Sequence, residues 1–193
     1  MTADRGFSST RLEAISDAVI AVAITIMVLE LHPPGAPTLP ALLGLWPQFE
    51  SYVISFGFIA TYWVNHHYLF HQLKRVDEKV LWSNMLLLFL LSLIPFATAY
   101  AGETREASFP TAVYAAVMLA NGMAYALLSA VIMAQYKGEP KPAAFGRVPM
   151  LINAGAVVLY ALAIPAAFFH PTVSLAMIFA VSLVYVSPLV RPQ

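Results

Sequence analysis

Residues 11–31 read Arg11-Leu-Glu-Ala-Ile-Ser-Asp-Ala-Val-Ile-Ala-Val-Ala-Ile-Thr-Ile-Met-Val-Leu-Glu-Leu31. This stretch is predominantly apolar, and crossing the hydrocarbon core of a bilayer takes roughly 20 such residues. His32-Pro33-Pro34-Gly35 follows, and the two prolines cannot continue a helix because they lack a backbone N–H. The stretch therefore predicts a transmembrane helix, and the chain is expected to be an integral membrane protein.

Five further stretches are apolar and of similar length: 46–70, 80–100, 110–136, 147–169 and 171–190. Pro95 lies inside the third predicted helix and predicts a kink there. The polar segments between the stretches are short, and none has the composition of a linker between domains. The sequence therefore predicts an all-α protein of six transmembrane helices, forming one domain over residues 1–193.

Composition supports a membrane protein. Of the 193 residues, 60% are hydrophobic and 10% are charged, whereas a soluble domain is about one quarter charged. The chain has no cysteine, which excludes a disulfide framework and a thiolate metal site. The formal net charge is zero, so the total charge indicates no nucleic-acid partner. Membrane lipid is the expected surrounding.

The basic residues predict the orientation. Basic residues are enriched in cytoplasmic segments of membrane proteins. Of the ten in this chain, only Arg105 falls on the opposite side of the predicted membrane from the other nine: Arg5, Arg11, Lys74, Arg75, Lys79, Lys137, Lys141, Arg147 and Arg191. Both termini are therefore expected in the cytoplasm. No small-residue cleavage site follows the first apolar stretch, so we expect that helix to be retained.

Polar residues lie at matched depth in three of the predicted helices. Asp17 is about six residues, or roughly 9 Å, inside the first helix. Trp63, His66 and His67 approach the same side in the second helix, and Asn84 enters the third from that side. Ionisable groups in a membrane are costly and usually have partners. We expect a hydrogen-bonded layer joining Asp17 to His66 or His67, with Asn84 and Trp63; a packing clamp with no role in transport fits equally.

Helical spacing places Ala18, Val22, Thr25 and Leu29 along one stripe of the first helix. The stripe presents aliphatic positions on either side of one hydroxyl. Periodicity alone favours an ordinary face of a helix bundle over a pore lining. A more specific signal is needed to assign conduction to this stripe.

Two motifs supply that signal. Arg11-Leu12-Glu13-Ala14-Ile15-Ser16-Asp17 resembles the R-x-x-x-F-S-D hallmark of the endolysosomal-type potassium channels, in their single-repeat bacterial and archaeal form. Trp63-Val64-Asn65-His66-His67-Tyr68-Leu69-Phe70 resembles the tryptophan-histidine motif of that family's second helix. The family phenylalanine is replaced by Ile15, while Arg11, Ser16 and Asp17 are kept. The family's six-helix topology covers the whole chain.

The resemblance implies a homotetramer in which four first helices surround a pore without a Thr-Val-Gly-Tyr-Gly filter. Counted from the motif aspartate, the family's ring positions fall on Val22, Thr25 and Leu29. We expect Val22 to form the narrowest ring and Thr25 the ring where potassium sheds part of its hydration shell. Glu13 and Glu30 lie near the two mouths, where they would concentrate cations or remain ordinary interfacial carboxylates.

The resulting prediction is a potassium-selective channel in a bacterial or archaeal cell (inner) membrane. It is not an enzyme and has no cofactor; K⁺ is the permeant ion, and the partners are further copies of the chain. A proton-coupled or other secondary cation transporter is the alternative, although such proteins usually show paired interrupted helices. His66-His67-x-x-x-His71 also resembles part of a di-iron histidine box, but His32 and His170 fall on the opposite side.

Overall fold

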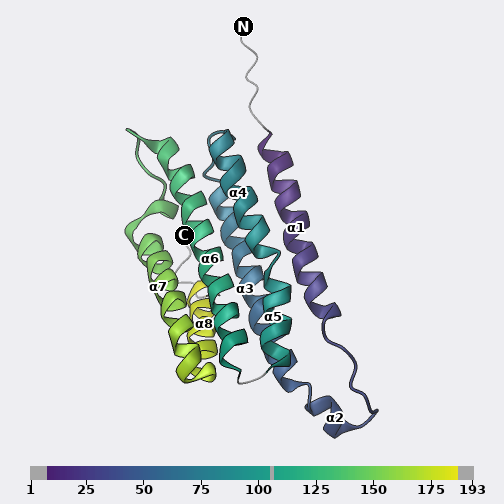
Figure 1. Ribbon diagram of the computed structural model, residues 1–193. Helices are drawn as coiled ribbons and strands as arrows, with labels where there is room; N and C mark the ends of the chain where they lie inside the picture. The colour runs from purple at the N-terminus through teal and green to yellow at the C-terminus, as the bar shows by residue number, and fades with distance from the viewer. Residues whose placement is uncertain (1–7, 105–106, 187–193) are drawn as a thin grey trace.

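The computed structural model describes residues 8–104 and 107–186, and every regular element among them is a helix (Figure 1). The all-α prediction is confirmed. Arg5, Arg105, Arg191 and the last four residues expected in the sixth helix, 187–190, lie outside the described residues.

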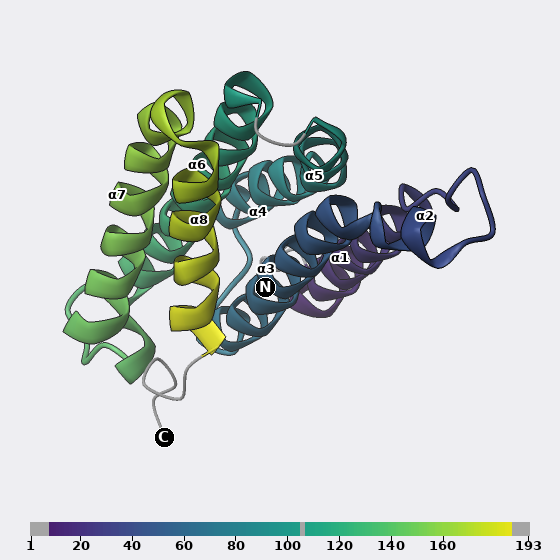
Figure 2. The ribbon, with the colours of Figure 1, turned by 90° about the horizontal axis from the view of Figure 1, so that it is seen from below.

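The first two predicted helices are α1 (Ser9–Leu29) and α3 (Trp46–Phe70), which run in opposite directions side by side (Figures 1 and 2). A short helix that the sequence did not predict, α2 (Leu39–Leu43), lies in the connection between them. Thr38 caps it, because its hydroxyl accepts a hydrogen bond from the backbone N–H of Ala41 at 3.4 Å.

The third predicted helix is divided into α4 (Glu78–Leu91) and α5 (Ile94–Glu103). Pro95 stands in the first turn of α5. It has no N–H to donate to the preceding turn, so the hydrogen-bond ladder is interrupted there. The predicted kink at Pro95 is therefore confirmed as a break. At its other end, α4 is capped by Asp77, whose Oδ1 accepts from the N–H of Val80 at 2.9 Å.

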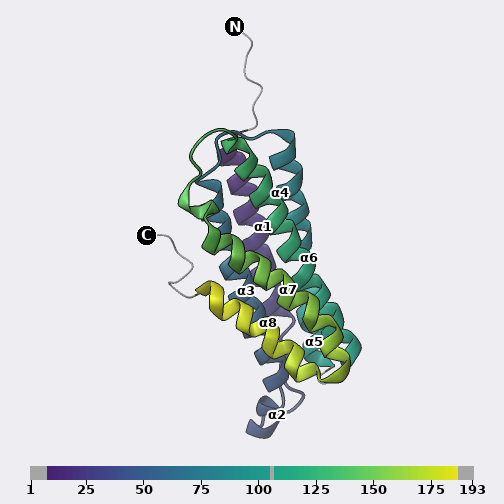
Figure 3. The ribbon, with the colours of Figure 1, turned by 90° about the vertical axis from the view of Figure 1, so that its left-hand side faces the viewer.

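The remainder of the chain comprises α6 (Ser108–Met133), the short 3₁₀ turns η1 (Ala134–Tyr136) and η2 (Ala143–Phe145), α7 (Arg147–Phe169) and α8 (Pro171–Val186). The α6 helix packs against α4, α5, α7 and α8, so it occupies the middle of the bundle. Figures 2 and 3 show α7 and α8 side by side, on the opposite side of α6 from α1.

The α1 helix lies at the edge of the bundle, packed on α3, α4 and α5. One stripe along it is buried against these helices: Leu12, Ser16, Ile20, Ala23 and Met27. These residues recur every three or four positions, which is the spacing of one helix face. The rest of α1 is largely exposed on the isolated protomer.

Several helices are long and apolar enough to cross a membrane. Among the described residues four meet both conditions: α1, the α4–α5 pair over Glu78–Glu103, the stretch Ser108–Tyr136, and α7. The 25 residues of α3 are long enough but include several polar side chains, and α8 is apolar but has only 16 residues. The chain is thus a multi-pass membrane protein, and the count of six spans stays a prediction.

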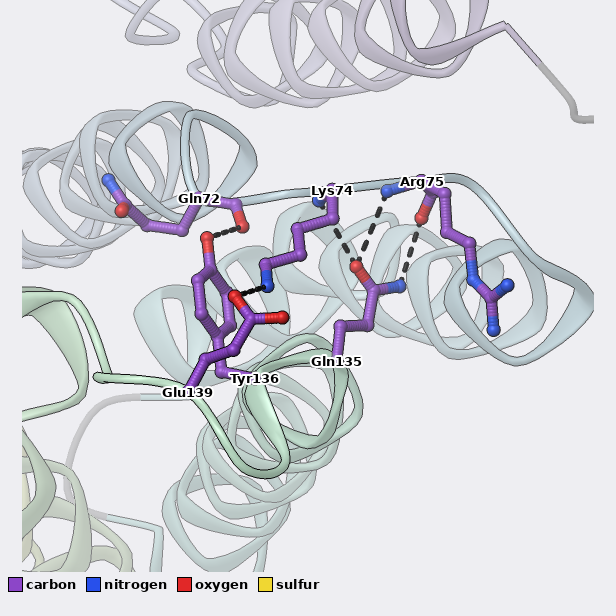
Figure 4. Close-up of polar contacts among 6 residues, drawn as sticks. All are labelled: Gln72, Lys74, Arg75, Gln135, Tyr136 and Glu139. Carbon is purple, nitrogen blue, oxygen red and sulfur yellow. Dashed lines mark hydrogen bonds and ion pairs between the residues drawn. The ribbon is translucent and has the colours of Figure 1, made fainter.

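The loop between α3 and α4 is hydrogen-bonded to η1, the turn that directly follows α6, as Figure 4 shows. Gln135 Oε1 accepts hydrogen bonds from the backbone N–H of Lys74 at 3.1 Å and of Arg75 at 3.4 Å. Gln135 Nε2 donates to the carbonyl of Arg75 at 2.9 Å. One amide side chain therefore satisfies three backbone groups of the loop.

Tyr136 and Glu139 reinforce the same connection (Figure 4). The Tyr136 hydroxyl donates to the carbonyl of Gln72 at 2.7 Å. Lys74 Nζ lies 2.5 Å from a carboxylate oxygen of Glu139 and 4.1 Å from the centre of the Tyr136 ring. These contacts fix the turn between α3 and α4, the two helices that carry the polar partners of α1 described below.

Candidate functional site

The stripe predicted to line a pore lies on the face of α1 that is turned away from its own bundle. Ala18, Val22, Thr25 and Leu29 are all exposed on the protomer, Val22 to 54% and Leu29 to 73%. Val22 and Leu29 are large aliphatic side chains. Exposed apolar side chains of this kind suit a surface that faces lipid, another chain or a narrow passage.

An open groove of about 510 Å³ runs beside this stripe, between α1 and the break that separates α4 from α5. Ala18, Val22, Ile26 and Glu30 form its α1 wall. The opposite wall is mainly Pro95, Phe96 and Ala99. The groove is mostly apolar, so the exposed face of α1 continues onto α5.

Thr25 is the hydroxyl residue of the stripe. Its Oγ1 lies 3.0 Å from the carbonyl of Val22 and 3.1 Å from that of Ala21. Because the hydroxyl hydrogen is directed to the helix backbone, the oxygen lone pairs remain free on the exposed side. Such an oxygen can act as a ligand for a partly dehydrated cation.

A hydrogen bond between side chains joins α1 to α3 at the exposed surface. Trp63 Nε1 donates to Asp17 Oδ1 at 2.9 Å. The contact fixes which side of α1 faces α3.

A second, buried chain joins α1, α3 and α4. Asn84 Nδ2 donates to Ser16 Oγ at 3.0 Å, and Ser16 in turn donates to the carbonyl of Leu12 at 2.7 Å. His66 Nε2 donates to Asn84 Oδ1 at 2.8 Å. All three polar side chains are buried. Each has a partner, which is the condition under which a buried polar network stabilises a fold.

The single polar layer predicted from the sequence is thus two separate connections. Asp17 pairs with Trp63 and not, as expected, with His66 or His67. The reason lies in the rotation of α3: His66 points inward and stacks on Phe70, with ring centroids 4.0 Å apart. Trp63 and His67 share the exposed side, where their rings stack with centroids 6.2 Å apart.

The remaining predicted site residues lie on the surface of α1. Arg11, Glu13 and Ile15 are exposed in its first turns. Glu30 is exposed directly after the last turn, so the two carboxylates stand at opposite ends of the helix. No metal site forms from three or more His, Cys, Asp or Glu side chains in the part of the chain that the structure describes.

One buried polar cluster was missed by the sequence reasoning. Ser55 Oγ lies 2.7 Å from the Tyr114 hydroxyl and 2.6 Å from Thr98 Oγ1. These residues come from α3, α6 and α5 respectively. The sequence does show that each of the three is a hydroxyl side chain inside an apolar helix. It does not show that the three helices meet. The cluster packs beside Met27 of α1.

Comparison with known proteins agrees with this architecture. The family profile described as "Endosomal/lysosomal potassium channel TMEM175" matches residues 11–95. A potassium channel of Chryseobacterium sp. (strain P1-3) is 38% identical over 181 residues, which are 92% of this chain and 92% of that protein. The endosomal/lysosomal proton channel TMEM175 of Rattus norvegicus is 30% identical over 115 residues, 51% of this chain and 23% of that protein.

A solved structure shares the fold over nearly the whole chain. It is the crystal structure of a lysosomal potassium-selective channel TMEM175 homolog from Chamaesiphon minutus, with a TM-score of 0.80 and 28% sequence identity. The match covers 92% of this chain and 96% of that one. The matching proteins are ion channels and not enzymes. The chain described here belongs to the TMEM175 family of potassium channels, as a homologue of its bacterial members.

Proposed function

We propose that this protein is a potassium-selective channel of a bacterial or archaeal cell membrane. Residues 1–193 form one channel domain with six spans and both termini in the cytoplasm. Four copies assemble so that the α1 helices surround the pore. The permeant ions are monovalent cations, and membrane lipid covers the outer surface.

The observation that carries the proposal is the orientation of α1. Its buried stripe, represented by Ile20 and Ala23, packs on the protomer's own helices, whereas Val22 and Thr25 face outward. A homotetramer supplies what this outward face lacks, because symmetric packing brings four identical stripes together around one axis. The apolar groove beside α1 provides surface for a neighbouring copy.

In such an assembly each residue of the stripe becomes a ring of four. A tight ring of Val22 side chains closes the pore by dewetting, because an ion cannot keep its hydration shell inside it. A ring of Thr25 hydroxyls replaces some of the lost water. Potassium loses water more readily than sodium, so this ring favours potassium without a cage of carbonyl groups. Leu29 forms a further aliphatic ring.

The polar contacts of α1 hold these rings in register. The Trp63–Asp17 hydrogen bond and the buried Ser16–Asn84 bond attach one end of α1 to α3 and α4. Because a helix turns as a unit, a rotation of α1 that displaced the rings would also strain these two bonds. Asp17 is thus proposed to position the pore helix rather than to bind the ion.

A second candidate function is proton conduction in addition to potassium conduction. The mammalian relatives carry the name proton channel. A secondary transporter is less well supported, because the matching relatives are named as channels.

Recordings from the purified protein in planar bilayers separate these possibilities. A potassium channel gives unitary current steps whose reversal potential follows the potassium gradient when sodium is present on the other side. A reversal potential that follows the pH gradient would favour proton conduction. Saturable flux without unitary steps would contradict a channel and favour a transporter.

A further inference from the structure

Two histidines at the end of α3 are placed together outside the proposed pore. His67 and His71 lie four positions apart, so they share a helix face. Their Nε2 atoms are 3.1 Å apart, and the rings are nearly perpendicular, with an interplanar angle of 87°. Both side chains are exposed. The two imidazole nitrogens therefore lie side by side at the accessible surface, within hydrogen-bond distance of each other.

This separation suits a shared metal ion. A nitrogen ligand binds a zinc-like ion at about 2.0–2.1 Å. Two such ligands on one ion are then roughly 2.9 Å apart at a right angle and roughly 3.3 Å apart at a tetrahedral angle. The observed 3.1 Å falls between these limits. Two histidines at this spacing on one helix face are also the first ligand pair of many zinc sites.

We propose that His67 and His71 form a binding site for a divalent transition-metal ion at the end of α3. The two imidazoles supply two ligands and water supplies the others, so the site is open. Imidazole favours Cu²⁺, Ni²⁺ and Zn²⁺, whereas Mg²⁺ and Ca²⁺ require oxygen ligands. The site does not depend on the proposed function, because it uses no residue of the α1 stripe.

The neighbouring histidine of α3, His66, does not compete for the ion. His66 is buried and its Nε2 is committed to Asn84. His67 and His71 therefore remain the two imidazoles available to an ion at this point.

Trp63 provides a direct reporter. Its ring stacks on that of His67 at 6.2 Å, and a bound Cu²⁺ or Ni²⁺ ion at this range quenches indole fluorescence. The protein, freed of any histidine tag, would carry Trp46→Phe and Trp82→Phe so that Trp63 is the remaining tryptophan. Titration with CuCl₂ should quench the fluorescence saturably at lower metal concentrations than titration with NiCl₂. Titration with MgCl₂ should not quench it.

The matched variants are His71→Ala, which removes one ligand, and His170→Ala, which removes an exposed histidine elsewhere. Loss of a ligand should weaken Ni²⁺ binding by about tenfold or more, since even a supporting residue of a metal site is worth that much. His170→Ala should change nothing. Equal quenching in His71→Ala and the parent protein would overturn the proposal, as would quenching by Ni²⁺ that never saturates.

A second variant distinguishes the loss of a metal ligand from a change in folding. The natural chain has no cysteine, so His71→Cys introduces a single thiol in place of the imidazole. This variant should bind Cd²⁺ at least as tightly as the parent protein, and Cd²⁺ should protect the thiol from alkylation. An unprotected thiol in a protein that still elutes with the parent's size and conducts potassium would contradict the site while leaving the channel assignment intact.

Discussion

The indole Nε1 of Trp63 donates a hydrogen bond to Oδ1 of Asp17 at 2.9 Å, although the two residues are 46 positions apart in the chain. The bond joins the two stretches that resemble the family's motifs, one on α1 and one on α3. It connects α1 to the helix packed beside it. Asp17 stands one residue before Ala18, where the exposed stripe begins. The hydrogen bond between the two motifs therefore holds α1 in one rotation about its own axis.

Removing the donor of this bond should loosen α1. Trp63→Phe keeps an aromatic ring but leaves the Asp17 carboxylate without the indole N–H. We expect a loss of about 1 kcal/mol in stability, because the contact is exposed on the protomer, together with smaller potassium currents. Thermal unfolding of the purified protein, followed by its elution in size-exclusion chromatography, measures the first effect. Trp82→Phe, an exposed tryptophan on α4, is the control; an equal loss in both variants would contradict the role of the bond.

The buried network should be more sensitive than the exposed bond. Asn84→Leu leaves Ser16 Oγ and His66 Nε2 without a side-chain partner, and an unsatisfied buried polar group costs about 1–3 kcal/mol. We expect a clear drop in the unfolding temperature. Ser92→Ala, at the exposed break between α4 and α5, should have little effect. If His66→Phe combined with Asn84→Leu is no more stable than Asn84→Leu alone, the loss does not come from the orphaned histidine.

Thr25 should control ion selectivity. Thr25→Ala removes the oxygen that can replace part of the hydration shell, so the ratio of potassium to sodium permeability should fall toward unity. Thr25→Ser restores an oxygen in the same place and should restore most of the ratio. Reversal potentials in bi-ionic conditions measure both. A ratio unchanged in Thr25→Ala would show that another residue selects the ion.

Val22 should set how easily the pore wets. Val22→Asn places a polar side chain at the position proposed to be the narrowest, so water should enter more readily and the open probability should rise. Val22→Leu enlarges the aliphatic side chain at this position and should therefore reduce leak current. Val28→Asn, an exposed position off the stripe, serves as the control. Equal open probability in Val22→Asn and the parent channel would remove Val22 from the gate.

Much of this arrangement can be predicted from the sequence, because the bilayer imposes strong constraints on helix length and on the depth of polar residues. Hydropathy predicts α1 and α7 to within a few residues, and Pro95 predicts the break in the third helix. Two hydrogen bonds join residues that matched depth had placed together, Trp63 to Asp17 and His66 to Asn84, but not in the predicted single layer with His67. The short helix α2 was missed, since its five residues have too little periodicity to detect.

The pairing within this polar set could not be predicted from depth alone. Depth gives the position of a residue along its helix, but its partner depends on the rotation of the helix, which tertiary packing determines. His66 faces inward because Phe70, one turn further along, packs into the core. Trp63 consequently faces Asp17. The cluster of Ser55, Thr98 and Tyr114 was missed for the same reason.

The central claim, that α1 lines a potassium pore, is tested most directly by cysteine substitution in single-channel recordings. The chain has no cysteine of its own, so each introduced thiol is the sole target of a water-soluble thiol reagent. Thr25→Cys is predicted to react and block the potassium current in steps. Ala23→Cys, on the buried face two positions away, is predicted to be unaffected. Full potassium current through fully modified Thr25→Cys channels, or block of Ala23→Cys alone, would contradict the account.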